Sequence, residues 1–168
     1  ALVLCVAMLV GSTFAWFTDT ATTGVNKIQS GKLDVKLSYL ADNNEWKEVT
    51  KDTELFKDGA LWEPGHTEVA YLKVENAGNL ALKYQLSVNV ANEVSGTNVN
   101  GESFKLSDYI KMGVVENQSM SFADRNAART AVEATAQNIK TSTVDGTIAA
   151  NDTNAQYVAL VVYMPETV

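Results

Sequence analysis

The chain has 168 residues, of which 46% are hydrophobic and 20% are charged, and these proportions suit one globular domain with a real hydrophobic core. Its formal net charge of −7 argues against nucleic acid and anionic membrane surfaces as partners, because both attract basic patches. The single cysteine, Cys5, lies in an apolar segment, so the rest of the chain can form neither a disulfide nor a thiolate metal site.

The amino-terminal segment has the plan of an export signal. Residues 1–10 are apolar throughout, a Gly-Ser-Thr break follows, and no charge occurs before Asp19. An apolar stretch of about 7–15 residues that ends in small residues is typical of a secretory signal peptide. The uncharged run is shorter than the ~20 residues of a membrane-spanning helix, although a permanent anchor and a buried core element remain alternatives. We predict that residues 1–15 are a truncated signal peptide.

Alternating apolar and polar residues predict the strands of the first half. This period of two covers residues 33–39 and 67–75 and is typical of half-buried strands. Residues 45–49 predict a short strand that returns along the first one. The Pro64-Gly65 pair predicts a tight turn before residue 67, because proline fixes φ and glycine accepts a positive φ.

The most regular alternation lies in residues 80–90, where every second residue from Leu80 to Val90 is apolar. We expect this segment to form a central strand. The preceding Asn76-Ala77-Gly78-Asn79 sequence predicts a hairpin connection to strand 67–75.

The second half combines polar loops, two strands and one helix. Residues 92–102 and 141–154 are polar and predict loops, whereas residues 104–115 and 157–164 predict strands. Residues 119–140 are rich in alanine, with apolar side chains at helical spacing, and Ser121 with Asp124 resembles a capping box. This pattern predicts a helix over about 121–140. The elements together predict a mostly β protein, an antiparallel β-sandwich with one inserted helix.

The sequence offers few groups for catalysis. His66 is the only histidine, so it cannot supply the two metal ligands of a zincin-type protease. A Ser-His-Asp or Cys-His arrangement would also have to include it. Because His66 follows a Pro-Gly turn, we expect an exposed turn residue. We therefore predict no catalytic residue, no metal ligand and no cofactor.

A cluster of acidic residues offers a second candidate site, for calcium. Its members lack the close alternate spacing of a calcium-binding loop, and a solvated acidic face is the favoured interpretation. The acidic residues are Asp42, Glu45, Asp52, Glu54 and Asp58.

Two motifs resemble those of a known family. The stretch from Gly11 to Asp19, followed by Ser30-Gly31-Lys32-Leu33-Asp34-Val35, is similar to the export-signal junction of the TasA/camelysin family. These are secreted biofilm-matrix fibre proteins that a dedicated SipW-type signal peptidase processes. Residues 62–66 and 74–83 resemble the Leu-x-Pro-Gly-Asp and Asn-x-Gly-Ser/Thr-Leu core of the same family. The two motifs occur in the expected order and cover roughly residues 11–90.

The resemblance implies a secreted structural subunit that assembles into extracellular-matrix or cell-surface fibres. Cleavage between Ala15 and Trp16 would leave a mature amino-terminal segment, residues 16–27, before one jelly-roll-like domain, residues 28–168. In such fibres this segment adds as a donor strand to the next subunit. The donor residues carried over are Trp16, Phe17, Thr18, Asp19, Ala21, Thr23 and Val25.

The implied partners are further copies of the chain, a SipW-type signal peptidase and an accessory matrix protein, with no nucleic acid. The Trp16-Phe17 pair fits this expectation, because two large apolar rings at a new amino terminus are costly to leave in water. They can dock on their own domain or on a neighbouring subunit. The chain ends earlier than the resemblance leads us to expect, which predicts a final strand beyond Val168.

Two other functions stay open at the level of sequence. Camelysin-type members have been classed as metallopeptidases, although the residues here do not support that activity. A monomeric surface-binding module for glycans or host protein would need an exposed aromatic platform, for which Trp46 and Trp62 are candidates.

Overall fold

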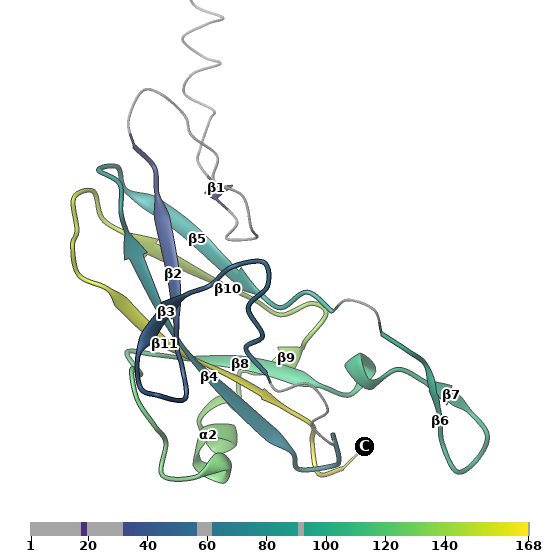
Figure 1. The fold of residues 1–168 in the computed structure, drawn as a ribbon. Helices are drawn as coiled ribbons and strands as arrows, with labels where there is room; N and C mark the ends of the chain where they lie inside the picture. Colours follow the sequence, from purple (N-terminus) through teal and green to yellow (C-terminus); the bar gives the residue numbers. More distant parts are fainter. Residues whose placement is uncertain (1–17, 20–31, 57–61, 91–92, 168) are drawn as a thin grey trace, which may run out of the picture.

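The computed structural model describes residues 18–19, 32–56, 62–90 and 93–167 (Figure 1). The predicted signal peptide and most of the predicted donor segment therefore lie outside the described residues. The elements are β1 (Thr18–Asp19), β2 (Val35–Leu40), β3 (Trp46–Glu48), β4 (Thr67–Asn76), β5 (Leu82–Ser87), β6 (Gly96–Thr97), β7 (Ser103–Phe104), the 3-10 helix η1 (Leu106–Asp108), β8 (Lys111–Glu116), α2 (Arg125–Val132), β9 (Gln137–Asn138), β10 (Thr143–Ile148) and β11 (Gln156–Tyr163).

The strands form one large sheet, one small sheet and a separate hairpin. The large sheet has the order β3-β2-β4-β11-β8-β9 and is antiparallel throughout. The small sheet has the order β1-β5-β10, in which β10 is antiparallel to β5 and β1 is parallel to it. Strands β6 and β7 form the hairpin. The predicted mostly β, antiparallel class is confirmed.

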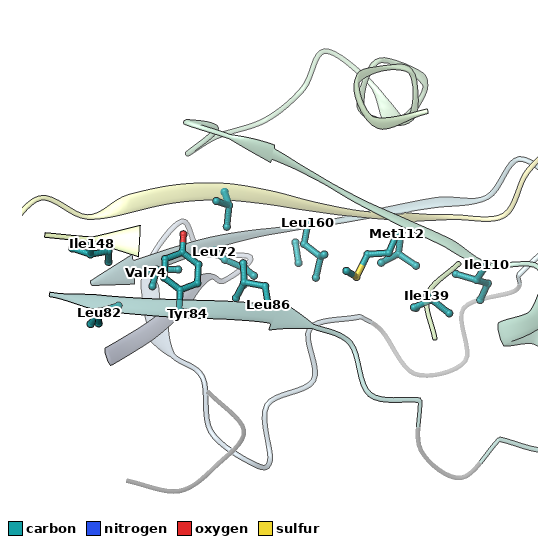
Figure 2. Packing of buried hydrophobic residues seen from close by; sticks show 13 residues of the cluster. Leu72, Val74, Leu82, Tyr84, Leu86, Ile110, Met112, Ile139, Ile148 and Leu160 are labelled. Carbon is teal, nitrogen blue, oxygen red and sulfur yellow. The ribbon is translucent and has the colours of Figure 1, made fainter. Parts of the chain in front are cut away.

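The main hydrophobic core lies between the two sheets. In Figure 2 the side chains of Tyr84 and Leu86 leave β5 toward Leu72 and Val74 of the large sheet, and Leu82 of β5 belongs to the same buried cluster. Alternate residues of β4 face this core, as the period of two in the sequence predicted, and so do alternate residues of β11. Two sheets that bury one face each against a common core define a sandwich.

The helix α2 packs on the outer face of the large sheet. Its Ala128 and Val132 are fully buried and form a second cluster with Val161 and Tyr163 of β11. Gly113 of β8 makes room for this contact, because a Cβ atom there would lie 2.5 Å from the Cβ of Val132. The predicted helix is therefore present and its apolar face is used.

The predicted length of this helix was wrong. It covers Arg125–Val132 rather than about 121–140, and its N-cap is Asp124, whose Oδ1 accepts a 2.7 Å hydrogen bond from the Ala127 N–H. Beyond it, residues 137–138 pair with β8 as strand β9, and Ile139 enters the core between the sheets. Strand pairing of residues 137–138 and burial of Ile139 stabilise this segment more than a longer helix would, so the helix ends at Val132.

The predicted hairpin at residues 76–79 was also wrong, because β4 and β5 belong to different sheets. The Ala77 and Asn79 N–H groups donate to the carbonyls of Asp34 and Lys32 at 2.8 and 2.9 Å, which extends the contact with the chain before β2. A Cβ at Gly78 would lie 2.0 Å from the Lys32 carbonyl oxygen, so only glycine fits there. The chain then crosses to the small sheet.

Other predictions were correct in kind but differ in extent. Strand β5 is the middle strand of the small sheet, although it is shorter than residues 80–90. Strand β8 begins only at Lys111, after η1. The Pro64-Gly65 turn is confirmed, with Gly65 at φ +88° and a hydrogen bond of 2.9 Å from the His66 N–H to the Glu63 carbonyl.

Two of the predicted loops contain strands. Residues 92–102 include β6, which pairs with β7, and residues 141–154 include β10. The second of these corrections bears on function, because β10 forms an edge of the small sheet.

Candidate functional site

The described part of the predicted donor segment forms a strand. Thr18 and Asp19 are β1, which lies parallel to β5 with Thr18 opposite Lys83 and Asp19 opposite Tyr84. The other predicted donor and cleavage residues lie outside the described residues: Ala15, Trp16, Phe17, Ala21, Thr23 and Val25. The structure thus brings two residues of the predicted donor segment to one edge of the small sheet.

The opposite edge of the small sheet is β10. Among the described strands, β10 pairs with β5 alone, with Asp145 opposite Gln85 and Gly146 opposite Tyr84. In an antiparallel ladder the backbone groups of successive pairs alternate between facing the partner and facing away. About half of the N–H and C=O groups of β10 therefore face away from β5. Such an edge is a template for an added strand.

A cleft of about 540 Å³ lies beside this edge, and we call it the β10 cleft. It is bounded by β5, β10, the end of β8 and the start of β11. The lining residues are Lys83, Tyr84, Gln85, Glu116, Asn117, Asp145, Gly146, Thr147, Gln156, Tyr157 and Val158.

A glycine and a tyrosine shape one wall of the β10 cleft. A Cβ at Gly146 would lie 2.1 Å from Cζ of Tyr84, so the phenol can reach this place only because residue 146 is glycine. The Tyr84 hydroxyl donates to Oε1 of Gln156 at 2.7 Å, and Nε2 of Gln156 donates to the Thr147 carbonyl at 2.7 Å. These two bonds tie β5, β11 and β10 together at the cleft.

Charged and amide groups give the β10 cleft its polar character. Burial, together with the negative charge of Glu116, raises the pKa of the Tyr84 hydroxyl, so this group stays protonated and donates at neutral pH. Nε2 of Gln85 donates to Oδ1 of Asp145 at 2.8 Å across the two strands. The residues that line the cleft include two carboxylates, Glu116 and Asp145, and one ammonium group, Lys83.

His66 lies outside this site, and the prediction that it is an exposed turn residue was wrong. Its side chain is only 15% exposed, and Nε2 lies 2.9 Å from Oε1 of Glu68. The ring of Trp62 meets the His66 ring edge-on at 4.8 Å. The contacts of His66 connect the Pro-Gly turn to the start of β4.

The two tryptophans proposed as an aromatic platform are both half-buried. Trp46 packs against Tyr157 with ring centroids 5.5 Å apart, and Nζ of Lys73 lies 5.7 Å from its ring. Trp62 packs against His66. Each ring therefore has a packing role within the domain.

The acidic residues of the candidate calcium site do not gather. Asp42, Glu45, Asp52 and Glu54 are exposed, and Asp58 lies outside the described residues. Across the part of the chain that the structure describes, no group of three or more His, Cys, Asp or Glu side chains is placed to hold a metal ion. In the same residues, no helix combines the length and apolar character that crossing a membrane requires.

Fold and site together define a mostly antiparallel β-sandwich whose small sheet carries an added amino-terminal strand. The chain belongs to the camelysin family, because the family model described as camelysin metallo-endopeptidase matches residues 1–159. The TasA/camelysin membership that the two sequence motifs indicated is therefore confirmed. No curated protein and no solved structure matches the chain significantly.

Thr18 and Asp19, which the family resemblance assigned to the donor segment, form β1, whereas sequence reasoning missed β10 and its cleft. The signal for β10 was the alternation of Val144, Gly146 and Ile148 toward the core. The polar composition of residues 141–154 indicated a loop instead, and only the position of Tyr84 explains why glycine stands in this strand.

Proposed function

We propose that this protein is a secreted structural subunit of an extracellular-matrix or cell-surface fibre, and that its amino-terminal segment adds as a strand to the next subunit. The observation that carries the proposal is the pairing of β1 with β5. It supports the idea that residues within the predicted donor segment enter a sheet of this domain as a strand. Secretion and processing by a SipW-type signal peptidase belong to the same proposal, and the family membership supports them.

Strand donation suits a fibre on physical grounds. Main-chain hydrogen bonds provide affinity that grows with the length of the added strand, while alternate side chains provide specificity. A segment that leaves one subunit and enters the next makes a heterologous contact, which repeats into an open filament. The proposed partners are further copies of the chain, the signal peptidase and an accessory matrix protein.

We also propose that the role is structural rather than enzymatic, although the family description names a metallo-endopeptidase. The engagement of His66 with Glu68 and Trp62 supports this, as does the lack of a metal-binding group among the described residues. Zinc content and peptide hydrolysis test it. Stoichiometric zinc together with hydrolysis that survives purification would make the peptidase the better assignment.

The decisive experiment compares two purified proteins, one that begins at Trp16 and one that begins at Lys27. Both are examined by electron microscopy and size-exclusion chromatography. We expect filaments from the longer protein only, because the shorter one lacks β1. If both stay monomeric at high concentration and after seeding, self-assembly loses its support, and a monomeric surface-binding module becomes the leading function.

A further inference from the structure

We propose that the β10 cleft is a binding site for a neutral polysaccharide chain, a ligand whose sugar rings carry many hydroxyl groups and no net charge. The proposal adds a binding activity to the structural role and does not depend on filament formation. The volume of the cleft, about 540 Å³, lies within the range of roughly 300–1,000 Å³ that small-ligand sites occupy.

Four side chains that line the β10 cleft have polar groups without a partner. Among the described residues, the side chains of Lys83, Glu116, Asn117 and Thr147 make no hydrogen bond and no ion pair. All four residues are exposed, so a ligand that enters the cleft from solvent can reach them. They come from β5, from β10 and from the end of β8, and the fold brings them to one cleft.

The mixture of these groups favours a ligand that both donates and accepts hydrogen bonds. The ammonium group of Lys83 only donates, the carboxylate of Glu116 only accepts, and the Asn117 amide and the Thr147 hydroxyl do both. A sugar hydroxyl donates one hydrogen bond and accepts two, so it can pair with any of them. A phosphate or carboxylate ligand offers no donor to Glu116, and an ammonium ligand offers no acceptor to Lys83.

A peptide also donates and accepts, but the β10 cleft suits it less well. Peptides that bind along a strand edge gain specificity from pockets that take alternate side chains. The unpartnered groups of this cleft are instead all polar side chains, as a ligand with hydroxyl groups along its whole length requires.

The walls of the β10 cleft are held in place before a ligand binds. The Tyr84 hydroxyl donates to Gln156, and Gln156 donates to the Thr147 carbonyl, both at 2.7 Å. Nε2 of Gln85 donates to Asp145 at 2.8 Å across the two strands. A site whose walls are already ordered costs a ligand less conformational entropy on binding.

Isothermal titration calorimetry tests the proposal on the full chain, exported by a host so that the secreted form is the one measured. The neutral probes are hexasaccharides of glucose, galactose, mannose and N-acetylglucosamine. The comparison probes are an anionic hexasaccharide of galacturonic acid, a cationic hexasaccharide of glucosamine, and a neutral octapeptide of alternating threonine and glycine.

Two pairs of variants locate the site. Thr147→Val removes a hydroxyl from the cleft, and its matched control is Thr143→Val, an exposed residue of the same strand outside the lining. Lys83→Met removes an ammonium group from the cleft, and its matched control is Lys47→Met on β3, which changes the net charge equally. Urea unfolding of all four variants verifies that they fold.

We expect saturable binding of at least one neutral hexasaccharide. Each cleft variant should weaken it about 2- to 10-fold, the loss expected for one hydrogen bond, and each control should leave it unchanged. The inference is wrong if no neutral hexasaccharide binds, or if the anionic, cationic or peptide probe binds more tightly than all of them. Equal effects of the cleft variants and their controls would also overturn it, because the ligand would then bind elsewhere. Electron microscopy of the same samples tests the fibre separately, so filaments without saccharide binding would leave the proposed function in place.

Discussion

At the scale of single residues, Gly146 is the position on which the shape of the β10 cleft depends. The phenol of Tyr84 occupies the space that a side chain at residue 146 would fill, and a hydrogen bond to Gln156 fixes the position of this phenol. The contact between Gly146 and Tyr84 could not be predicted from the sequence, because the two residues lie on strands that are far apart along the chain.

We expect Gly146→Ala to destabilise the domain by about 1–3 kcal/mol, the range typical of an overpacked core. The added Cβ would lie 2.1 Å from Cζ of a ring that cannot easily move aside. Urea unfolding followed by tryptophan fluorescence measures the effect. Thr147→Ala, at the neighbouring exposed residue, is the control and should change little. Equal stability of both variants would show that the Tyr84 ring moves freely.

Glu93 provides a prediction for the pH dependence of stability. Hydrogen bonds from the Ser107 N–H at 2.6 Å and from its hydroxyl at 2.7 Å lower the pKa of the Glu93 carboxyl below its ordinary value of 4.5. Because the pKa is lower in the folded state, this contact contributes stability above the unfolded pKa and loses it as the pH falls through the folded pKa.

We therefore expect Glu93→Gln to lose less stability than the wild type as the pH falls below about 4.5. Denaturant midpoints measured between neutral and acidic pH test this. Ser107→Ala should act in the same direction, because it removes one of the two bonds to the carboxylate. Parallel pH profiles for all three proteins would contradict the assignment.

At the scale of elements, the helix α2 shows how a local signal can be right in kind and misplaced along the chain. The sequence pattern made Ser121 the cap and Asp124 its partner in a capping box, whereas in the structure Asp124 is itself the N-cap. The residues after Val132 kept the helical spacing, but the edge of β8 accepts residues 137–138 as a strand.

We predict that Asp124→Ala destabilises the protein by about 1 kcal/mol, the usual loss for an N-cap, because the Ala127 N–H loses its acceptor. Ser121→Ala is the matched control and should have no measurable effect, since Ser121 is exposed and precedes the cap. Chemical denaturation of the two variants decides between them. A larger loss from Ser121→Ala would restore the cap that the sequence alone suggested.

At the scale of the whole molecule, charge opposes assembly. Each copy carries a formal net charge of −7, to which Glu116 and Asp145 at the β10 cleft contribute. Subunits that repel one another need screening before short-range hydrogen bonds can form between them.

We expect filament formation to become faster as salt rises from about 0.01 M to about 0.15 M, because the Debye length falls from about 30 Å to about 8 Å. Light scattering at fixed protein concentration follows the rate. The variant Glu116→Gln should assemble faster than the wild type at low salt and should differ less at high salt. Assembly that slows with added salt would show that attraction between unlike charges dominates instead.

The sequence by itself determined the local features of this protein. The period of two located β2 and β4, and the apolar run of residues 157–164 located β11. Pro64-Gly65 located the turn before β4, and two motifs indicated the family. These signals are local because the alternation of side chains across a strand and the φ preferences of proline and glycine act over a few neighbouring residues.

Only the tertiary structure decided which strands are neighbours. It placed β4 and β5 in different sheets, turned residues 143–148 into a strand that pairs with β5, and ended α2 at Val132. Each of these outcomes depends on a contact between residues far apart in the sequence, such as Gly78 with Lys32, Gly146 with Tyr84 or residues 137–138 with β8. Backbone hydrogen bonds and burial between distant segments override the local conformational preference of each segment. The local sequence pattern cannot predict them, because their free energy is gained only when the sheets pack together.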